Sequence, residues 1–160
     1  MLLFSQKTGV LCGILLDEGY LTDLRTAMAG AIVAKYLAPH TVNKIGIIGT
    51  GIQAKLQLHY LKNIINCKDV VVFGRNDRNL LEFKVEMEKN GFQIITTKIV
   101  EEVTSSCNLI VTTTPATSPI LFAEQIKKVL ILQLLGRILL INKSLMKIFS
   151  KLRMLLLQIA

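Results

Sequence analysis

The hexapeptide Gly49-Thr50-Gly51-Ile52-Gln53-Ala54 is the feature that most constrains how this chain can fold. It fits the pattern G-x-G-x-x-G/A, which is weak evidence alone because the pattern is short. Its context is stronger, since an apolar run at residues 44–49 precedes it and a helical pattern extends from it to about residue 65. A second apolar run at residues 69–73 ends about 20 residues later, as a dinucleotide-binding turn requires. The alternative is a tight strand–helix turn that binds no ligand.

The residues of this loop have separable tasks if a dinucleotide binds. Gly49 permits the tight turn, and Gly51 has no Cβ, so a pyrophosphate can approach the backbone. Ala54 is small enough for the helix to pack closely on the strand. The helix N-terminus then offers unpaired N–H groups to the phosphates. The residues predicted to bind a cofactor here are Gly49, Thr50, Gly51, Ile52, Gln53 and Ala54.

The end of the second strand selects between nicotinamide cofactors. Enzymes that use NAD commonly place an acidic residue there for the ribose 2′-hydroxyl, but residues 73–76 read F-G-R-N, and Asp77 is the first acid. Arg75 can pair with a 2′-phosphate. Arg75 and Asn76 are therefore predicted to bind the cofactor, and NADP(H) is favoured, with NAD(H) as the alternative. In the opposing interpretation, Arg75 is a solvated loop residue and Asp77 only caps the next helix.

The rest of the chain alternates strand and helix patterns, which predicts a parallel sheet with right-handed connections. Ahead of the hexapeptide, a β-hairpin is predicted, and then a helix that Thr22 or Asp23 caps and Pro39 ends. The fold class is α/β, with a Rossmann-type parallel sheet of about four strands. The predicted segments are a hairpin at 1–4 and 10–16, helices at 24–37 and 77–90, strands at 93–99 and 108–113, and a helical turn at 100–106.

Three consecutive threonines stand at the end of the fourth predicted strand. Ligands of open α/β sheets bind at the carboxyl ends of the strands. Thr112, Thr113 and Thr114 could therefore line the ribose or nicotinamide side of the cofactor. A β-branched strand end followed by a turn explains the same residues without a ligand.

Composition excludes several other classes. Cys12, Cys67 and Cys107 are too few and too scattered for a disulfide framework or a zinc site, so we expect reduced, buried thiols in a cytoplasmic protein. The net charge is +8, but residues 129–160 hold five of the nineteen basic residues and none of the eleven acidic ones. The body lacks a basic patch interleaved with aromatic residues, which disfavours nucleic acid as a partner. The N-terminus lacks the features of a signal peptide.

Five motifs in order resemble the ornithine cyclodeaminase/mu-crystallin family, over about residues 1–128. They read Y-L-T-D-L-R-T-A-M-A-G-A at 20–31, A-K-Y-L-A-P at 34–39, G-I-I-G-T-G-I-Q-A at 46–54, V-F-G-R-N at 72–76 and V-T-T-T-P at 111–115. The resemblance implies a homodimer, a Rossmann domain joined to a substrate and dimerisation domain, and a small amino-acid or imino-acid substrate. Arg25 matches the arginine that holds the substrate carboxylate, a task that suits a bidentate guanidinium.

The family also implies the chemistry. In cyclodeaminases the cofactor takes a hydride from the α-carbon of ornithine, the δ-amine attacks the resulting imine, ammonia leaves, and the hydride returns to give proline. Dehydrogenases and ketimine reductases of the family stop at one hydride transfer, and the mu-crystallins show that the fold can serve as an NADPH-binding protein without catalysis. Arg75 resembles the arginine of the NADPH-binding members, which leans toward the reductases.

The chain departs from the family pattern at both ends. Family members run to roughly 330 residues. We expect residues 1–40 to be a remnant of the substrate domain, 41–128 an incomplete Rossmann domain, and 129–160 a tail foreign to the family. The family continues after the position of Lys128 with a strand and the motif A-V-G-A/S-D-x-P-x-K-x-E-L, whose Asp is the catalytic acid/base. That motif is absent here, so no catalytic residue is assigned and this chain is expected to be inactive.

A single-base deletion in the codons of Lys127-Lys128 would explain the foreign tail. With suitable synonymous codons, the frame that starts one nucleotide earlier reads G-T-H-I-T-A-V-G-S-D-T-P-Y-K-Q-E-L-D-E-N-I-F, with Ile138 standing where the catalytic Asp codon would be. We therefore expect DNA sequencing of codons 127–138 to show that a one-base shift restores the motif; a gene in which no such shift does so contradicts the hypothesis. The alternative is a basic amphipathic helix at a membrane surface. In either interpretation of the tail, the fourth strand is expected to lose its neighbour.

Overall fold

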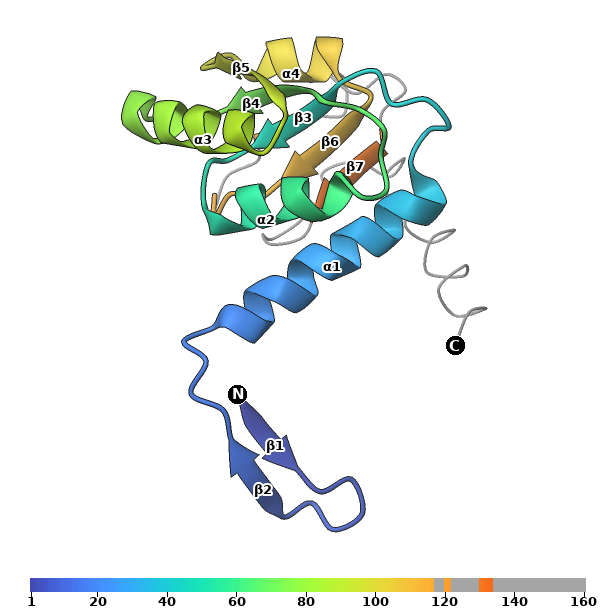
Figure 1. The fold of residues 1–160 in the computed structure, drawn as a ribbon, viewed down its shortest axis with the longest axis vertical. Coiled ribbons are helices and arrows are strands. Elements are labelled where there is room, and N and C mark those ends of the chain that lie inside the picture. Colours follow the sequence, from blue (N-terminus) through green and yellow to red (C-terminus); the bar gives the residue numbers. More distant parts are fainter. Residues whose placement is uncertain (117–119, 122–129, 134–160) are drawn as a thin grey trace.

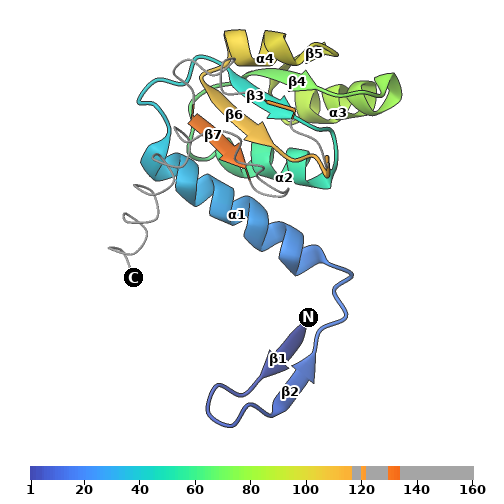
Figure 2. The same cartoon turned by 180° about the vertical axis from the view of Figure 1, so that it is seen from behind.

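The computed structural model describes residues 1–116, 120–121 and 130–133, and its centre is a five-stranded parallel sheet in the order β5-β4-β3-β6-β7 (Figure 1). Helices cover both faces of the sheet, with α2 and α3 on one side and α4 on the other (Figure 2). This confirms the predicted α/β class and Rossmann-type parallel sheet. The elements of the sheet domain are β3 (Ile45–Ile48), α2 (Ile52–Leu61), β4 (Asp69–Phe73), α3 (Asp77–Lys89), β5 (Gln93–Thr97), α4 (Val100–Ser106), β6 (Leu109–Thr112) and β7 (Leu130–Gln133).

The strand order reverses direction beside β3. The chain runs outward from β3 to β4 and β5 and then returns to place β6 on the other side of β3. The last residue of β3, Ile48, pairs in register with Phe73 of β4 and Thr112 of β6. The carboxyl ends of β3 and β6 thus lie side by side at a topological switch point, where open α/β sheets bind ligands.

Two apolar clusters hold the layers together. The larger one joins the sheet to α2 and α3, and Phe83 of α3 is its largest fully buried side chain. The smaller one joins the other face of the sheet to α4 through Val103 and Cys107. Gly46 lets α4 lie close on β3, because a Cβ there would stand 2.5 Å from Cγ1 of Val103. These clusters fix the strand ends and the loops that follow them.

A hairpin and a long helix precede the sheet. β1 (Leu2–Phe4) and β2 (Leu11–Ile14) pair antiparallel, which confirms the predicted hairpin. The helix α1 (Tyr20–Leu37) is longer than predicted.

The predicted cap of α1, Thr22 or Asp23, is wrong. Gly19, at φ 91°, is the N-cap residue, and no side chain caps it. A carboxylate oxygen of Asp17 instead accepts from the backbone N–H of Leu21 at 2.9 Å. The helix ends ahead of Pro39 as predicted, because Ala38 takes the extended conformation that a following proline favours.

The structure corrects the expectation about the fourth strand. The sequence predicted about four strands, with the strand at 108–113 left without a neighbour. Instead, β7 pairs parallel with β6 from Leu109↔Leu130 to Thr112↔Gln133. The apolar start of the tail therefore supplies a fifth strand. Residues 134–160, for which a frameshift or a membrane-surface helix was considered, lie outside the described residues.

The cysteines agree only partly with the prediction. Cys67 and Cys107 are buried, and burial raises the pKa of both thiols. Cys12, in the hairpin, is exposed, contrary to the expectation of three buried thiols. Within the described residues, no group of His, Cys, Asp and Glu side chains could hold a metal ion. No helix of the described part is long and apolar enough to cross a membrane.

Candidate dinucleotide-binding site

The turn from β3 into α2 is shaped by Gly49. Its φ of 115° is strained for any side chain, and a Cβ there would stand 2.8 Å from Oγ1 of Thr113. The Gly49 N–H donates to the carbonyl of Phe73 at 2.9 Å. The protein itself therefore requires glycine at this position, both for the turn and for the close passage of the chain after β6.

Gly51 is a glycine for a different reason. As the N-cap of α2 it has φ −78° and ψ −174°, a conformation open to any residue. Apart from Gly51 itself and its two chain neighbours, no described residue has an atom within 4 Å of the position a Cβ would take. The fold itself does not require glycine at this position, so the open space beside Gly51 can accommodate part of a bound molecule. No side chain caps α2 and its first turn contains no acid, which leaves the positive helix end available to an anion.

Thr113 and Thr114, which follow β6, lie against this turn, and Thr112 is the last residue of β6. Thr113 donates its backbone N–H to the carbonyl of Ile48 at 2.9 Å and its hydroxyl to the same oxygen at 3.2 Å. Thr114 also lies close, since its Cγ2 would be 3.2 Å from a Cβ on Gly49. The hydroxyl of Thr112 is buried and has no hydrogen-bond partner among the described residues. An unpaired buried hydroxyl is costly, which makes it a candidate contact for a bound molecule.

The three residues of the hexapeptide that belong to α2 differ in burial and in their contacts. Ala54 is fully buried against the sheet, as close packing of helix and strand requires, whereas Ile52 is 67% exposed. Gln53 is buried and uses its amide within the protein, donating to the backbone carbonyl of Asp23 at 3.0 Å and to the Asp23 carboxylate at 2.8 Å. Sequence reasoning missed this contact, because nothing in the pattern relates residues thirty positions apart.

A second contact continues the same helix–helix interface. Gln57, fully buried on α2, donates its amide to the carbonyl of Thr26 on α1 at 3.2 Å. Arg25 belongs to this part of α1, but its side chain is exposed, and no described residue forms a hydrogen bond or ion pair with it. The structure thus brings the helix of Arg25 to the glycine loop and leaves the guanidinium free of described partners.

The chain after β4 carries the residues predicted for the ribose. Arg75 is exposed and has no hydrogen bond or ion pair with any described residue. Asn76 caps α3, since its Oδ1 accepts from the backbone N–H of Asn79 at 3.2 Å. The alternative role of Asp77 as the helix cap is therefore wrong, and its carboxylate pairs with Lys98 instead. Thr50 reaches this segment, because its Cγ2 would be 2.9 Å from a Cβ on Gly74.

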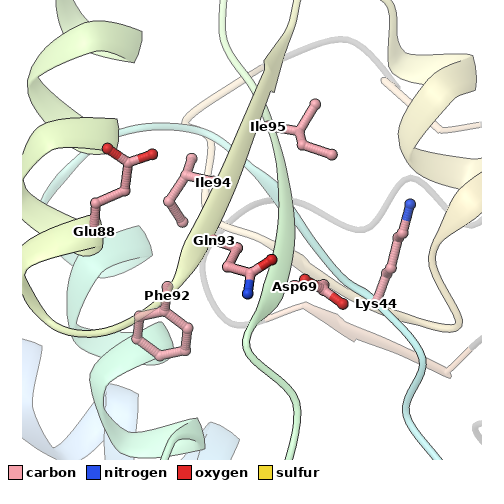
Figure 3. A pocket seen from close by; sticks show the side chains of 7 residues that line it. All are labelled: Lys44, Asp69, Glu88, Phe92, Gln93, Ile94 and Ile95. Carbon is pink, nitrogen blue, oxygen red and sulfur yellow. The ribbon is translucent and has the colours of Figure 1, made fainter.

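A groove of about 510 Å³ lies elsewhere, at the amino ends of the strands (Figure 3). Asp69 and Gln93, the first residues of β4 and β5, line it together with Lys44, Glu88, Phe92, Ile94 and Ile95. The amino ends of parallel strands all lie on one side of the sheet and the carboxyl ends on the opposite side. This groove is therefore not part of the glycine-loop site.

Comparison with known proteins identifies the chain. A profile of the ornithine cyclodeaminase/mu-crystallin family matches residues 1–137. The chain belongs to this family. An uncharacterized cyclodeaminase of Sinorhizobium fredii is 40% identical over 126 residues, covering 78% of this chain and 38% of that protein. The chain thus spans under two fifths of the length of this family member.

Two solved structures of family members share the fold. The Δ1-pyrroline-2-carboxylate reductase of Thermococcus litoralis, in complex with NADH and L-proline, superposes with a TM-score of 0.75 at 30% identity, over 84% of this chain and 42% of that one. An archaeal alanine dehydrogenase dimer with bound NAD gives a TM-score of 0.72 at 33% identity, over 81% and 40% of the two chains. Both relatives therefore bind a nicotinamide dinucleotide.

Proposed function

We propose that this chain binds a nicotinamide dinucleotide, with a preference for NADP(H), at the carboxyl ends of β3, β4 and β6. The observation that carries the proposal is the open space at Gly51, where the fold tolerates a side chain but the sequence has none. The buried hydroxyl of Thr112, at the end of β6, has no hydrogen-bond partner among the described residues and also supports the proposal. The NADH and NAD bound in the two solved relatives support dinucleotide binding independently, whereas the preference for NADP(H) rests on Arg75.

The residues divide by the part of the cofactor that each would hold. The first turn of α2, from Gly51 to Ala54, would bind the pyrophosphate through its backbone N–H groups. Arg75 and Asn76 follow β4 and would meet the adenosine ribose, where the guanidinium of Arg75 can pair with a 2′-phosphate. Thr112 at the end of β6 and the two threonines that follow it would lie beside the nicotinamide half, with Thr112 donating or accepting one hydrogen bond. When bound, the nicotinamide supplies hydride transfer at the α-carbon of an amino or imino acid.

For the whole protein we propose family chemistry on such a substrate. Deaminating cyclisation of L-ornithine to L-proline and ammonia is one form, and NADP(H)-dependent reduction of a cyclic imine is the other. The guanidinium of Arg75, which has no partner among the described residues, favours NADP(H), and the likeness to a pyrroline-carboxylate reductase favours imine reduction. Arg25 would hold the substrate carboxylate in either reaction. The homodimer, the cytoplasmic location and the lack of a catalytic acid in this chain stay predictions.

Binding and turnover separate these proposals. We expect the purified chain to bind NADPH saturably, as measured by the change in nicotinamide fluorescence, and more tightly than NADH. We expect it to form no proline from ornithine, nor from Δ1-pyrroline-2-carboxylate with NADPH. A chain that is folded by circular dichroism but binds neither nucleotide would contradict the cofactor proposal. Proline formation would instead show that the chain is active, contrary to the prediction.

A further inference from the structure

A lysine that the motif does not contain stands beside the predicted ribose site. Lys98 follows β5, the strand next to β4. The register pairs Phe73 with Thr97, and the N–H of Gly74 donates to the carbonyl of Thr97 at 3.2 Å. Lys98 is thereby held beside Gly74, the first residue of the β4–α3 loop, and Gly74 directly precedes Arg75. Two cations from two neighbouring strand ends thus flank the place where the ribose is expected.

The backbone around Lys98 is fixed. The buried side chain of Thr97 accepts from the N–H of Ile99 at 2.9 Å, which closes a short turn around Lys98. The position of Lys98 therefore follows from the sheet register and from this turn, and does not depend on the flexible end of its own side chain.

Asp77 forms an ion pair with Lys98. The Nζ of Lys98 lies 2.7 Å from Oδ2 of Asp77, the first residue of α3, and both side chains are more than half exposed. The other nearby cation, Arg78, is engaged by Glu82 at 2.8 Å on the outer face of α3. Arg75 and Lys98 are therefore two cations placed for an anion beyond β4, and the Asp77 carboxylate competes for Lys98.

We propose that Lys98 is a specificity-determining residue, which binds the 2′-phosphate of NADP(H) together with Arg75 and pairs with Asp77 when no 2′-phosphate is bound. The inference rests on the proposed nucleotide site. A 2′-phosphate carries close to two negative charges, so it competes with a single carboxylate for the ammonium group. A ribose with a free 2′-hydroxyl has no charge to offer, and Lys98 then stays with Asp77. The pair thus makes the preference between the two cofactors depend on two residues of opposite sign.

Two substitutions should shift the preference in opposite directions. K98M is expected to weaken NADPH binding three- to tenfold and to leave NADH binding within twofold, since partly exposed ion pairs are modest in strength. D77N removes the competitor and a like charge, so it is expected to strengthen NADPH binding severalfold. The matched control is K84M, which removes an exposed lysine that pairs with Glu88 on α3 and so makes the same change in net charge.

The measurement is the ratio of NADPH to NADH dissociation constants for the four proteins. Equal ratios for K98M and K84M, or a fall of the NADPH preference in D77N, would overturn the role of Lys98. Calorimetry with 2′,5′-ADP and 5′-ADP tests the ribose end without the nicotinamide half, and K98M should weaken only the first. If the unsubstituted chain binds none of these nucleotides, the nucleotide site itself is wrong. If it binds them without any effect of K98M, only the inference about Lys98 fails.

Discussion

Replacement of Gly51 by valine is expected to weaken nucleotide binding by about 100-fold while leaving the fold intact. Gly51 has an ordinary φ of −78°, and a Cβ at this position meets no described atom within 4 Å outside its chain neighbours, so the free protein has open space where the new side chain begins. The side chain would instead fill the space proposed for the pyrophosphate and keep it from the N–H groups of α2. Hydrogen bonds to charged groups contribute roughly 1.5–3 kcal/mol each, and a loss of about 2.7 kcal/mol corresponds to 100-fold.

Gly49 provides the matched control for this prediction. Gly49→Ala places a Cβ at a φ of 115° and 2.8 Å from Oγ1 of Thr113, so it should lower the free energy of unfolding. Gly51→Ala should instead change it by less than about 1 kcal/mol, because the restriction of the unfolded chain by alanine is offset by the poor preference of alanine for the N-cap position. Urea denaturation and NADPH titration of the variants separate the two effects. Nucleotide affinity unchanged in Gly51→Val would show that no phosphate lies against this loop.

Truncation of Phe83 to alanine is expected to destabilise the chain by about 3–5 kcal/mol, the largest effect we foresee on stability. Phe83 is fully buried between α3 and the sheet, together with Leu80 and Met87 from the same helix. Removing the ring leaves a cavity that the close-packed neighbours cannot fill. Since domains are stable by only about 5–15 kcal/mol, the loss brings this chain near unfolding.

Leu81 is the matched control in the same helix, because its side chain is 62% exposed. Leu81→Ala should change the free energy of unfolding by less than about 0.5 kcal/mol. Denaturant midpoints measured by circular dichroism compare the two variants with the parent chain. Equal midpoints for Phe83→Ala and Leu81→Ala would mean that α3 does not pack on the sheet through this face. Loss of α3 would also displace Asn76 and Arg75, so nucleotide binding should fall in parallel with stability.

The sequence predicted most of the sheet domain because its elements are short, apolar and clearly bounded. The strand Asp69–Phe73 came out with the predicted bounds. Prediction failed where a contact distant in sequence decides the outcome. The start of α1 was misplaced because Asp17, ahead of the helix, takes the part expected of Thr22 or Asp23. The fifth strand was missed because the start of the tail is a mostly apolar run, which does not by itself distinguish a buried strand from a helix.

The candidate site shows the same division. The roles of Gly49 and Gly51 could be predicted because a tight turn and the close approach of a ligand to the backbone both favour glycine. Their different reasons became visible only with the surrounding atoms. Asp23 and Lys98 could not be found from the sequence, since each owes its place to packing of elements that are separate along the chain.

The bonds of Gln53 to Asp23 have a mechanical consequence. Because α1 is joined to the glycine loop at its first turns, it behaves as part of the nucleotide-binding body and not as part of the segment before it. A hinge between hairpin and nucleotide site would then lie at residues 17–19, where both Glu18 and Gly19 have positive φ. The hairpin extends from the end of α1 nearest to this loop (Figure 1). The hairpin would then move about a point four residues ahead of Asp23, whose backbone carbonyl and carboxylate accept hydrogen bonds from Gln53.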